Sequence, residues 1–356
     1  MPTRAGRSGG PSLRLLRKLC EAVAVSGDEG EVREIALEEI GPSENEHLVD
    51  ALGNLLITRS GRGKRRLRVM LDAHMDEVGF MLVAEDGEGL YEFSLVGDID
   101  PRNLIGKQVV VGSKHTPGVI GAKPIHLTTA EDRKRALTIE ALRVDLGPGG
   151  KAQVGDRGAF APNFRRTGPS VMSKALDNRT GVASLIELAK GAFANVDVLA
   201  AFTVQEEIGL RGAKVAANYF GPDLAIVIET TPARDLPMQK EGDNTFYNTM
   251  LGLGPAIYVS ERSAIDDPRL VQFMMDTAKR AGIPFQVRQA GGGGTDAGAI
   301  QRAGAGVPVV TVAVPHRYPH SATSVARIED WKNTSLLLGA ALKHITPELL
   351  GRGRRR

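Results

Sequence analysis

The chain has 356 residues, of which 42% are hydrophobic and 24% are charged, and its formal net charge is +3. This is the balance of a soluble globular protein with a sizeable core, and the length predicts a domain of ordinary size plus a second one. No stretch reaches the roughly 18 consecutive apolar residues of a membrane-spanning helix, so the composition excludes an integral protein of that kind.

The single cysteine and the N-terminus give a prediction of the cellular compartment, and both ends of the chain are basic. Cys20 excludes an internal disulfide, fits a reducing compartment and is interpreted as a small core residue of a helix. The N-terminus lacks the apolar segment of a secretory signal, which predicts a cytoplasmic location. Much of the basic excess lies in residues 1–11 and 350–356, which we expect to be disordered, solvated tails; a contact with nucleic acid or an acidic partner is the less favoured alternative.

Two helices and two strands are predicted in the first part of the chain. The spacing of apolar residues indicates amphipathic helices over 12–24 and 30–40 and strands over 50–58 and 67–71. The second strand runs directly into the polar sequence DAHMDE.

The pattern of apolar and turn-forming residues changes between residues 79 and 170. Short apolar runs alternate with turn sequences such as EDGEG, GDIDP and GPGGK, and helical periodicity is nearly absent. This pattern indicates a small all-β unit, either a barrel or a sandwich. The highly charged segment 127–139 is expected to be an exposed loop within it.

After residue 170 helices and strands alternate. Helices are expected over 178–193, after 267–268, after 294–295 and over 329–344, and strands over 197–205, 224–230, 285–290 and 307–315. Such alternation predicts a mostly parallel sheet covered on both faces. The predicted fold class is therefore α/β, a mixed, mostly parallel sheet flanked by helices, with a small β-barrel or sandwich domain at 79–170 inserted between the two parts, 1–78 and 171–356, of the larger domain.

Side chains suited to chemistry lie at the predicted strand ends, where sites usually form in an α/β sheet. They are His74, Asp177, Glu206, Glu207, Glu229 and His320.

Each of these residues has an ordinary explanation when taken alone. An isolated histidine such as His74 is more often a hydrogen-bonded core residue, Asp177 can cap a helix, Glu206 and Glu207 can form a solvated strand end, Glu229 can pair with an arginine, and His320 can be a loop residue. However, an apolar strand such as AIVIE rarely ends in a buried carboxylate without a partner, because an unpaired buried charge is costly.

Taken together, the residues favour a metal site. Two imidazoles with three carboxylates suit zinc, cobalt or manganese. One carboxylate bridging two ions about 3.5–4 Å apart would give a two-metal site. Glu206 and Glu207 are expected to face different directions on their strand, so that one can bind a metal while the other points to substrate.

Five motifs in order resemble the M42 family of metallo-aminopeptidases, the glutamyl-aminopeptidase and tetrahedral-aminopeptidase group within the co-catalytic zinc exopeptidases. They are AHMDEVGFML, KALDNRTGVASLIEL, FTVQEEIGLRGA, GGGTDAGAI and HRYPHSATSV. The resemblance extends from about residue 12 to 345.

The resemblance implies a role for each candidate residue. It also implies two divalent ions per subunit, either zinc or cobalt, with manganese as a further alternative. The implied metal ligands are His74, Asp177 as the bridging carboxylate, Glu207, Glu229 and His320, with Glu206 as general base and Asp76 as the aspartate that supports a ligating histidine. It further implies that the inserted segment is a dimerisation domain and that dimers assemble into a hollow tetrahedral dodecamer. Two departures are that many members carry Asp where Glu229 stands and a glutamate near the position of Ser324.

The implied reaction is hydrolysis of the N-terminal residue of a peptide. A metal-bridging water would lose its proton to Glu206, the ions would polarise the carbonyl, and one ion would bind the free α-amino group. The alternatives are a deacylase, deblocking enzyme, carboxypeptidase or other amidohydrolase on the same scaffold, an endoglucanase-labelled relative, and a non-catalytic assembly or binding protein. A glycosidase needs two carboxylates without metal, and the paired histidines argue against it.

The remaining motifs carry weaker predictions. The segment 291–298, GGGGTDAG, opens a helix but lacks the Lys-Ser/Thr of a phosphate loop, so it is expected to face substrate through Thr295 and Asp296. His126 receives no catalytic role. Surface positions, or positions supporting the ligands, are predicted for His115, His316 and His344, and Arg211 and Arg317 are expected to hold nearby carboxylates or a loop.

Overall fold

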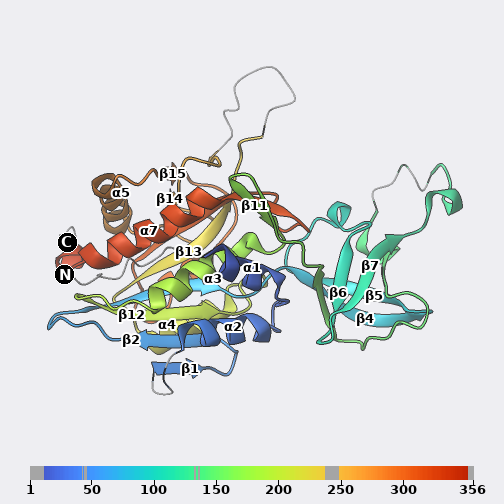
Figure 1. Ribbon diagram of the computed structural model, residues 1–356, viewed down its shortest axis with the longest axis horizontal. Helices are drawn as coiled ribbons and strands as arrows, with labels where there is room; N and C mark the ends of the chain where they lie inside the picture. Colours follow the sequence, from blue (N-terminus) through green and yellow to red (C-terminus); the bar gives the residue numbers. More distant parts are fainter. Residues whose placement is uncertain are drawn as a thin grey trace, which may run out of the picture.

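The structure is a computed structural model that describes residues 12–41, 43, 46–131, 134, 137–236 and 248–351. A large mixed sheet with helices forms one unit, and a six-stranded barrel forms the other (Figure 1). Residues 1–11 and 352–356 of the predicted tails lie outside the described residues. Leu350 and Gly351 belong to the short helix α8 (Glu348–Gly351), so the prediction of a disordered tail was wrong for these two residues. Among the described residues, no helix combines the length and apolar character needed to cross a membrane.

The N-terminal segment contains the two predicted helices, α1 (Leu13–Glu21) and α2 (Gly30–Ile40). Two short antiparallel strands follow, β1 (His47–Val49) and β2 (Leu55–Arg59), where the sequence predicted one strand over 50–58. That prediction was wrong for 50–54. The Asp50 carboxylate accepts hydrogen bonds from the backbone N–H groups of Leu52, Gly53 and Asn54, which closes a tight turn there.

Four parallel strands form the centre of the large sheet, in the order β12 (Val196–Thr203), β3 (Leu67–His74), β13 (Leu224–Pro232) and β16 (Val309–Arg317). Antiparallel strands extend it on both sides. Beyond β12 lie β2 and β1, and beyond β16 lie β17 (Ser324–Arg327), β11 (Ser170–Ser173) and β10 (Arg165–Thr167), while β14 (Ala256–Tyr258) pairs with β16 and with β15 (Gln286–Arg288). The sheet is thus mixed, as predicted, with its parallel part in the middle.

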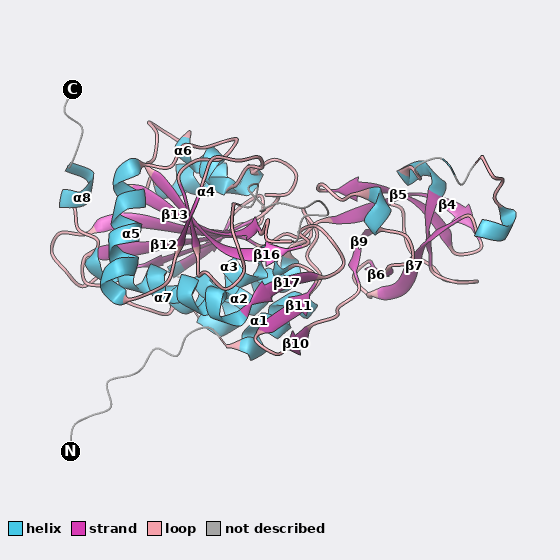
Figure 2. Cartoon of the chain, turned by 90° about the horizontal axis from the view of Figure 1, so that it is seen from above, coloured by secondary structure: helices cyan, strands magenta, loops and turns pink. Residues whose placement is uncertain are grey.

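Helices cover both faces of this sheet. The larger core lies under α1, α2, α3 (Leu176–Ala189), α5 (Pro268–Ala281) and α7 (Ile328–His344), and the smaller one under α4 (Arg211–Phe220) and α6 (Asp296–Gln301). Figure 2 shows α4 and α6 on the opposite side of the strands from α1, α2 and α7. Val69 and Leu71 of β3 pack in the larger core and Met70 in the smaller one. Since both faces are buried, the central strands are apolar at nearly every position.

The inserted unit is a closed barrel, which decides between the two predicted forms. Its strands are β4 (Gly79–Gly87), β5 (Leu90–Val96), β6 (Gln108–Val111), β7 (Thr116–Ala122), β8 (Leu142–Asp145) and β9 (Arg157–Phe160), closed in the order β4-β5-β8-β7-β6-β9. A separate core fills it, and its packing is tight enough that a Cβ at Gly158 would lie 2.2 Å from the Phe80 ring. The domain boundaries at 79 and 170 stay a prediction; β10 and β11, at the end of that range, pair within the large sheet.

Short 3-10 helices connect the barrel strands. They are η2 (Pro101–Asn103), η3 (Ile125–Leu127) and η5 (Ile139–Ala141). The predicted loop 127–139 runs between the last two and is mostly exposed where the structure describes it, while residues 132, 133, 135 and 136 lie outside the described residues.

Candidate metal centre

The candidate residues meet at one edge of the large sheet. His74 is the last residue of β3, Glu229 lies near the end of β13, and Glu206 and Glu207 come shortly after β12. Because these strands are parallel and adjacent, their carboxyl ends lie together. His320 follows β16 by three residues, and Asp177 lies in the first turn of α3, where it does not cap the helix.

The distances divide the cluster into two groups that share Asp177. His74 Nε2 lies 3.3 Å from Asp177 Oδ1 and 3.4 Å from Glu229 Oε1. His320 Nε2 lies 3.6 Å from Asp177 Oδ2 and 3.4 Å from Glu207 Oε2. One carboxylate therefore presents one oxygen to each imidazole, and each group could hold a metal ion with three protein ligands.

Hydrogen bonds at the far ring nitrogens orient both histidines. His74 Nδ1 lies 3.1 Å from the carbonyl oxygen of Asp76, and His320 Nδ1 lies 2.8 Å from that of Asp98. A proton on Nδ1 in each ring leaves the Nε2 lone pair directed at the carboxylates. This is the arrangement that metal-binding histidines usually have.

The charge of the cluster also suits divalent cations. Burial raises the pKa of Glu207 to about 8 and that of Glu229 to about 7, and it raises the pKa of Glu206 well above its usual range. Burial opposes the charged form of His74, but Glu229 and Glu206 outweigh it and raise the pKa of the imidazole. Among the described residues no lysine or arginine forms an ion pair with these carboxylates, so a metal ion would offset an excess of buried negative charge.

Asp76 fixes the loop that carries the two glutamates. Its buried carboxylate accepts hydrogen bonds from the backbone N–H groups of Glu206 (3.0 Å) and Glu207 (3.1 Å), and from the Ser26 hydroxyl (2.6 Å). The adjacent Gln205 has a left-handed backbone with φ of 58°, which is uncommon for a residue other than glycine. The expectation that Glu206 and Glu207 lie on a strand was wrong, because β12 ends at Thr203 and both side chains line the same cavity from a turn.

Sequence reasoning did not find the buried ion cluster behind the centre. Glu77 accepts from Lys174 Nζ at 2.7 and 2.8 Å and from Arg179 Nη2 at 2.9 Å, and all three side chains are at most 2% exposed. Lys174 and Arg179 also donate to the backbone carbonyls of Ala22 and Leu19. The cluster ties β3, the start of α3 and the end of α1 together. The only signal was charge in the apolar contexts HMDEVGF and KALDNRT.

A cavity of about 360 Å³ opens onto the centre. Thr295 lines it and caps α6, whereas Asp296 does not line it. Asp296 is 1% exposed and accepts a hydrogen bond from the Thr203 hydroxyl at 2.7 Å. Burial and the adjacent Asp296 raise the pKa of Asp72, so these two carboxyls form a buried pair beneath the site rather than a surface within it.

The other predicted polar residues lie outside the two ligand groups. His316 is 1% exposed, which excludes the surface alternative of its prediction and leaves a position supporting the ligands, and burial lowers its pKa to about 4. His115 contacts Glu31, and His126 and His344 are exposed. Arg317 binds the Asp235 carboxylate with two hydrogen bonds of 2.7 and 2.9 Å, and Arg211 contacts the Gln205 side chain at 3.5 Å, in agreement with the expectation that they hold a carboxylate and a loop.

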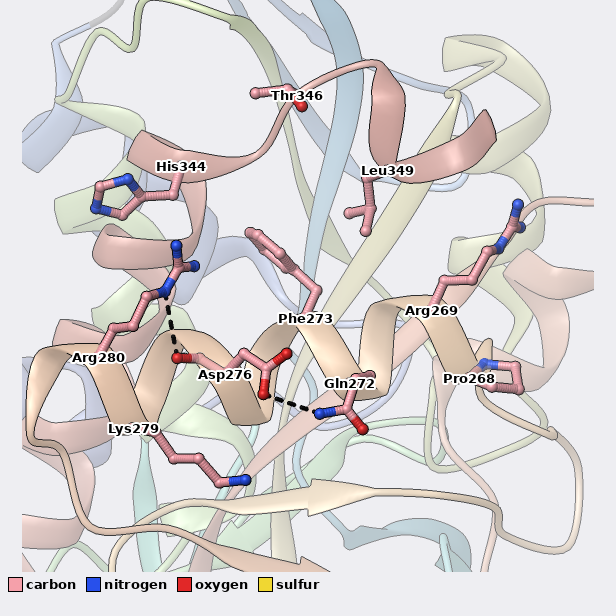
Figure 3. A pocket seen from close by; sticks show the side chains of 10 residues that line it. All are labelled: Pro268, Arg269, Gln272, Phe273, Asp276, Lys279, Arg280, His344, Thr346 and Leu349. Atoms are coloured by element: carbon pink, nitrogen blue, oxygen red, sulfur yellow. Dashed lines mark hydrogen bonds between the residues drawn. The ribbon is translucent and has the colours of Figure 1, made fainter. Parts of the chain in front are cut away.

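A second cavity, of about 850 Å³, lies between α5 and the segment that joins α7 to α8 (Figure 3). Its walls include Phe273, Leu349, Lys279, Arg280 and His344. None of the residues of the metal centre lines it, so its greater size does not make it the site of the chemistry.

Comparison with known proteins decides the family. The family model of M42 glutamyl aminopeptidases matches residues 53–337. The chain belongs to the M42 family. Its members are aminopeptidases, which makes this protein a hydrolase of that class.

Relatives and solved structures resemble this M42 protein over almost its full length. A putative aminopeptidase of Acetivibrio thermocellus is 36% identical, with 92% of this chain and 97% of the relative covered. The glutamyl aminopeptidase of Lactococcus lactis is 30% identical (94% and 96% covered), and the lysyl aminopeptidase of Pyrococcus furiosus is 31% identical (94% and 97% covered).

Among solved structures, the TET aminopeptidase of a marine sediment thaumarchaeote superposes with a TM-score of 0.89 at 33% identity, with 95% of this chain and 98% of that one covered. The TET1 peptidase of Pyrococcus horikoshii, which can assemble into a tetrahedron or a large octahedral shell, gives a TM-score of 0.80 at 32% identity, with 94% and 99% covered.

Proposed function

We propose that this M42 protein is a dinuclear metallo-aminopeptidase that removes the N-terminal residue of peptides. The single observation that supports it most is the pair of histidine–carboxylate groups that share Asp177. A shared carboxylate between two three-ligand groups is the donor arrangement that a two-ion hydrolytic site requires.

The residues for each ion follow from the distances. His74, Asp177 and Glu229 would hold one ion, and Asp177, Glu207 and His320 the other. Imidazole nitrogen combined with carboxylate oxygen suits zinc, cobalt or manganese. When bound, such ions supply Lewis-acid activation of water and of the scissile carbonyl.

Glu206 is the proposed general base. Its carboxylate lines the cavity and belongs to neither of the two groups that share Asp177; with His74 and Glu207 it forms a third group that lacks this shared carboxylate. Burial raises the pKa of its carboxyl above the usual glutamate range while no ion is bound. A carboxylate at this place in the cavity can accept a proton from water and return it to the leaving amine. Asp76 holds the backbone of Glu206 in place, so the carboxylate approaches the cavity from a fixed turn.

The experiment compares aminoacyl-4-nitroanilides with their N-acetylated forms, with and without a chelator. We expect hydrolysis only of the free-amine substrates, loss of activity on chelation and recovery on adding zinc, cobalt or manganese. Activity that survives chelation, or that is confined to acetylated substrates, would contradict the proposal and favour a different amidohydrolase.

The substitution Glu206→Gln tests the role of Glu206 as general base separately from metal binding. We expect kcat to fall by about 10²- to 10⁴-fold while the two ions remain bound, as measured by elemental analysis. Glu187→Gln is the matched control, because Glu187 lies on α3 and pairs with Lys190 away from the cavity. Full turnover by the Glu206 variant would refute its role.

We further infer that the protein self-associates through the barrel, with a tetrahedral dodecamer as the expected assembly. The support is the assembly named for the Pyrococcus horikoshii TET1 peptidase and a group of exposed apolar side chains on the barrel. That group includes Val119, Ile125, Leu127 and Val154, which are 37–71% exposed. Sedimentation velocity tests the inference, and a monomer at micromolar concentration would contradict it.

A further inference from the structure

A run of basic residues occupies the turn between β2 and β3. The sequence GRGKRRLR at 61–68 contains four arginines and one lysine. Arg66 pairs with the Asp197 carboxylate at 2.7 Å. Arg62 and Lys64 are exposed, and in the part of the chain that the structure describes no carboxylate forms an ion pair with either of them. The turn therefore presents positive charge that its surroundings do not neutralise.

Helix α8 contacts this turn and also forms part of the wall of the 850 Å³ cavity beside α5. Arg65 Nη1 lies 3.9 Å from the Glu348 carboxylate, and the arginine side chain is 81% exposed. The next residue of α8, Leu349, lines the cavity. In Figure 1 the turn after β2 and the C-terminal end of α7 both lie at the end of the molecule opposite the barrel. The turn and the cavity therefore belong to one end of the large unit.

The cavity adds basic side chains from the ends of two further helices. Lys279 and Arg280 lie in the last turn of α5, and His344 lies in the last turn of α7. Arg280 donates to neutral acceptors, the Asp276 carbonyl (3.3 Å) and the Thr277 hydroxyl (3.2 Å), and Figure 3 shows it pointing from α5 toward the segment that carries His344. Among the described residues no carboxylate forms an ion pair with these three side chains. Basic residues favour helix C-termini because they complement the helix dipole, but here two helices place theirs around one cavity.

The basic charge of the chain is concentrated at this end. Residues 352–356, which follow α8 directly in the sequence, contain four arginines, and residues 1–11 contain two more with no acidic residue. Because the net charge of the whole chain is +3, these six positive charges leave a formal charge of −3 on residues 12–351. The unpaired cations of the turn and the cavity are therefore a local feature of a body that is acidic as a whole, which is the charge distribution of a surface for a polyanion.

We propose that this basic end, formed by the turn at 61–68, the cationic wall of the 850 Å³ cavity and residues 352–356, binds single-stranded nucleic acid. Its cations come from separate segments, so a polyanion can engage them together, whereas a small anion would reach only a few. Most of them are arginines, whose planar guanidinium matches a phosphate in a paired, two-bond geometry. The half-buried ring of Phe273 also lines the cavity, where an unpaired base can stack on it, and this favours a single strand over an acidic peptide.

The test measures the binding of a fluorescent 20-nucleotide oligothymidylate to the full-length protein by anisotropy, over a series of salt concentrations. The affinity should fall as salt rises, with a logarithmic slope of about −0.7 for each phosphate contact. The triple variant Arg62→Gln, Lys64→Gln and Arg280→Gln removes three cations from the turn and the cavity. We expect it to reduce the slope by about 2 and to weaken binding by about 10²-fold at 0.1 M salt, since each lost contact costs about fivefold there.

The matched control removes the same charge from exposed positions of the barrel and α4, by Lys107→Gln, Lys123→Gln and Lys214→Gln. It should bind the oligonucleotide within about twofold of the wild type, and none of the six substituted residues lines the cavity of the metal centre, so peptidase activity should not change in either variant. Equal losses of affinity in the two variants would reduce the effect to net charge and overturn the inference.

Two competitors test the choice of ligand on the wild-type protein, which needs no folded variant. Displacement of the single strand by a 20-base-pair duplex or by poly-L-glutamate should require at least about tenfold more competitor at equal charge. A duplex that competes equally well would overturn the preference for a single strand, and poly-L-glutamate that competes equally well would assign the surface to an acidic peptide instead. The absence of oligonucleotide binding at 50 mM salt would refute the inference and leave the proposed peptidase function untouched.

Discussion

Replacing Asp76 with asparagine should damage catalysis more than it damages the fold. The carboxylate accepts one backbone N–H on each oxygen, that of Glu206 on Oδ1 and that of Glu207 on Oδ2. An asparagine has only one acceptor oxygen, so its amide NH₂ must face one of these N–H groups in either orientation. The loss of one charge-assisted hydrogen bond at a buried site costs about 1.5–3 kcal/mol of the free energy of unfolding. The turn then shifts, and a displacement of about 1 Å in a positioned catalytic group can lower the rate by about 10²-fold.

Asp330→Asn provides a closely matched control. Like Asp76, Asp330 is buried, at 1% exposure, and its two oxygens accept the N–H groups of Gly252 (2.7 Å) and Gly254 (2.9 Å), but it does not line the cavity. Both variants should lose similar stability in urea titrations. At saturating metal only the Asp76 variant should lose about 10²-fold in kcat on an aminoacyl-anilide. Equal kcat values for the two variants would refute the reasoning, because Asp76 would then contribute to stability alone.

Two further predictions concern buried charges near the centre. Burial raises the pKa of Glu29 from 4.5 to about 7, so its contribution to stability is present below pH 4.5 and is lost as the pH rises through 7. Glu29→Gln keeps the oxygen that accepts hydrogen bonds from the Gly27 and Gln205 N–H groups. In urea unfolding, the variant should be up to about 3 kcal/mol more stable than the wild type at pH 8 and nearly as stable as the wild type at pH 5. A variant that is less stable than the wild type at pH 8 would contradict this prediction. Glu77→Gln should lower the free energy of unfolding by about 3–5 kcal/mol in the same assay, because Lys174 and Arg179 would stay buried without their counter-charge. A loss below about 1 kcal/mol would show that the cluster is not needed for folding.

The parts of the fold that the sequence predicts are those with a strong local pattern. The central strands are predictable because they are apolar runs buried on both faces, and α5 and α7 because their apolar spacing is helical. The helix α4 was not among the predicted elements, and it packs on the sheet through small residues such as Gly212, Ala213 and Ala216. The predicted strand over 50–58 included the turn at 50–54, although Asp50, Gly53 and Asn54 are typical turn residues.

The candidate ligands could be predicted as a set because each one follows or ends a buried strand or begins a helix. Their division into two groups could not, since it depends on which oxygen of Asp177 faces which imidazole. The function of Asp76 in holding two backbone N–H groups depends equally on the left-handed turn at Gln205, a position where nothing in the sequence marks an unusual backbone. Contacts between distant segments, such as Glu77 with Lys174, are fixed by topology rather than by local pattern.

The hydrogen bond from His320 Nδ1 to the Asp98 carbonyl joins the barrel to the metal centre. Asp98 also lines the cavity, so a residue just beyond β5 helps to shape the site on the large sheet. The two units have separate cores, yet one imidazole takes its orientation from both of them. If His320 binds a metal ion as proposed, a rotation of the barrel against the sheet would change the affinity of the imidazole for that ion, and by thermodynamic reciprocity the bound ion would oppose the rotation. Metal binding would then stabilise one orientation of the barrel relative to the large sheet.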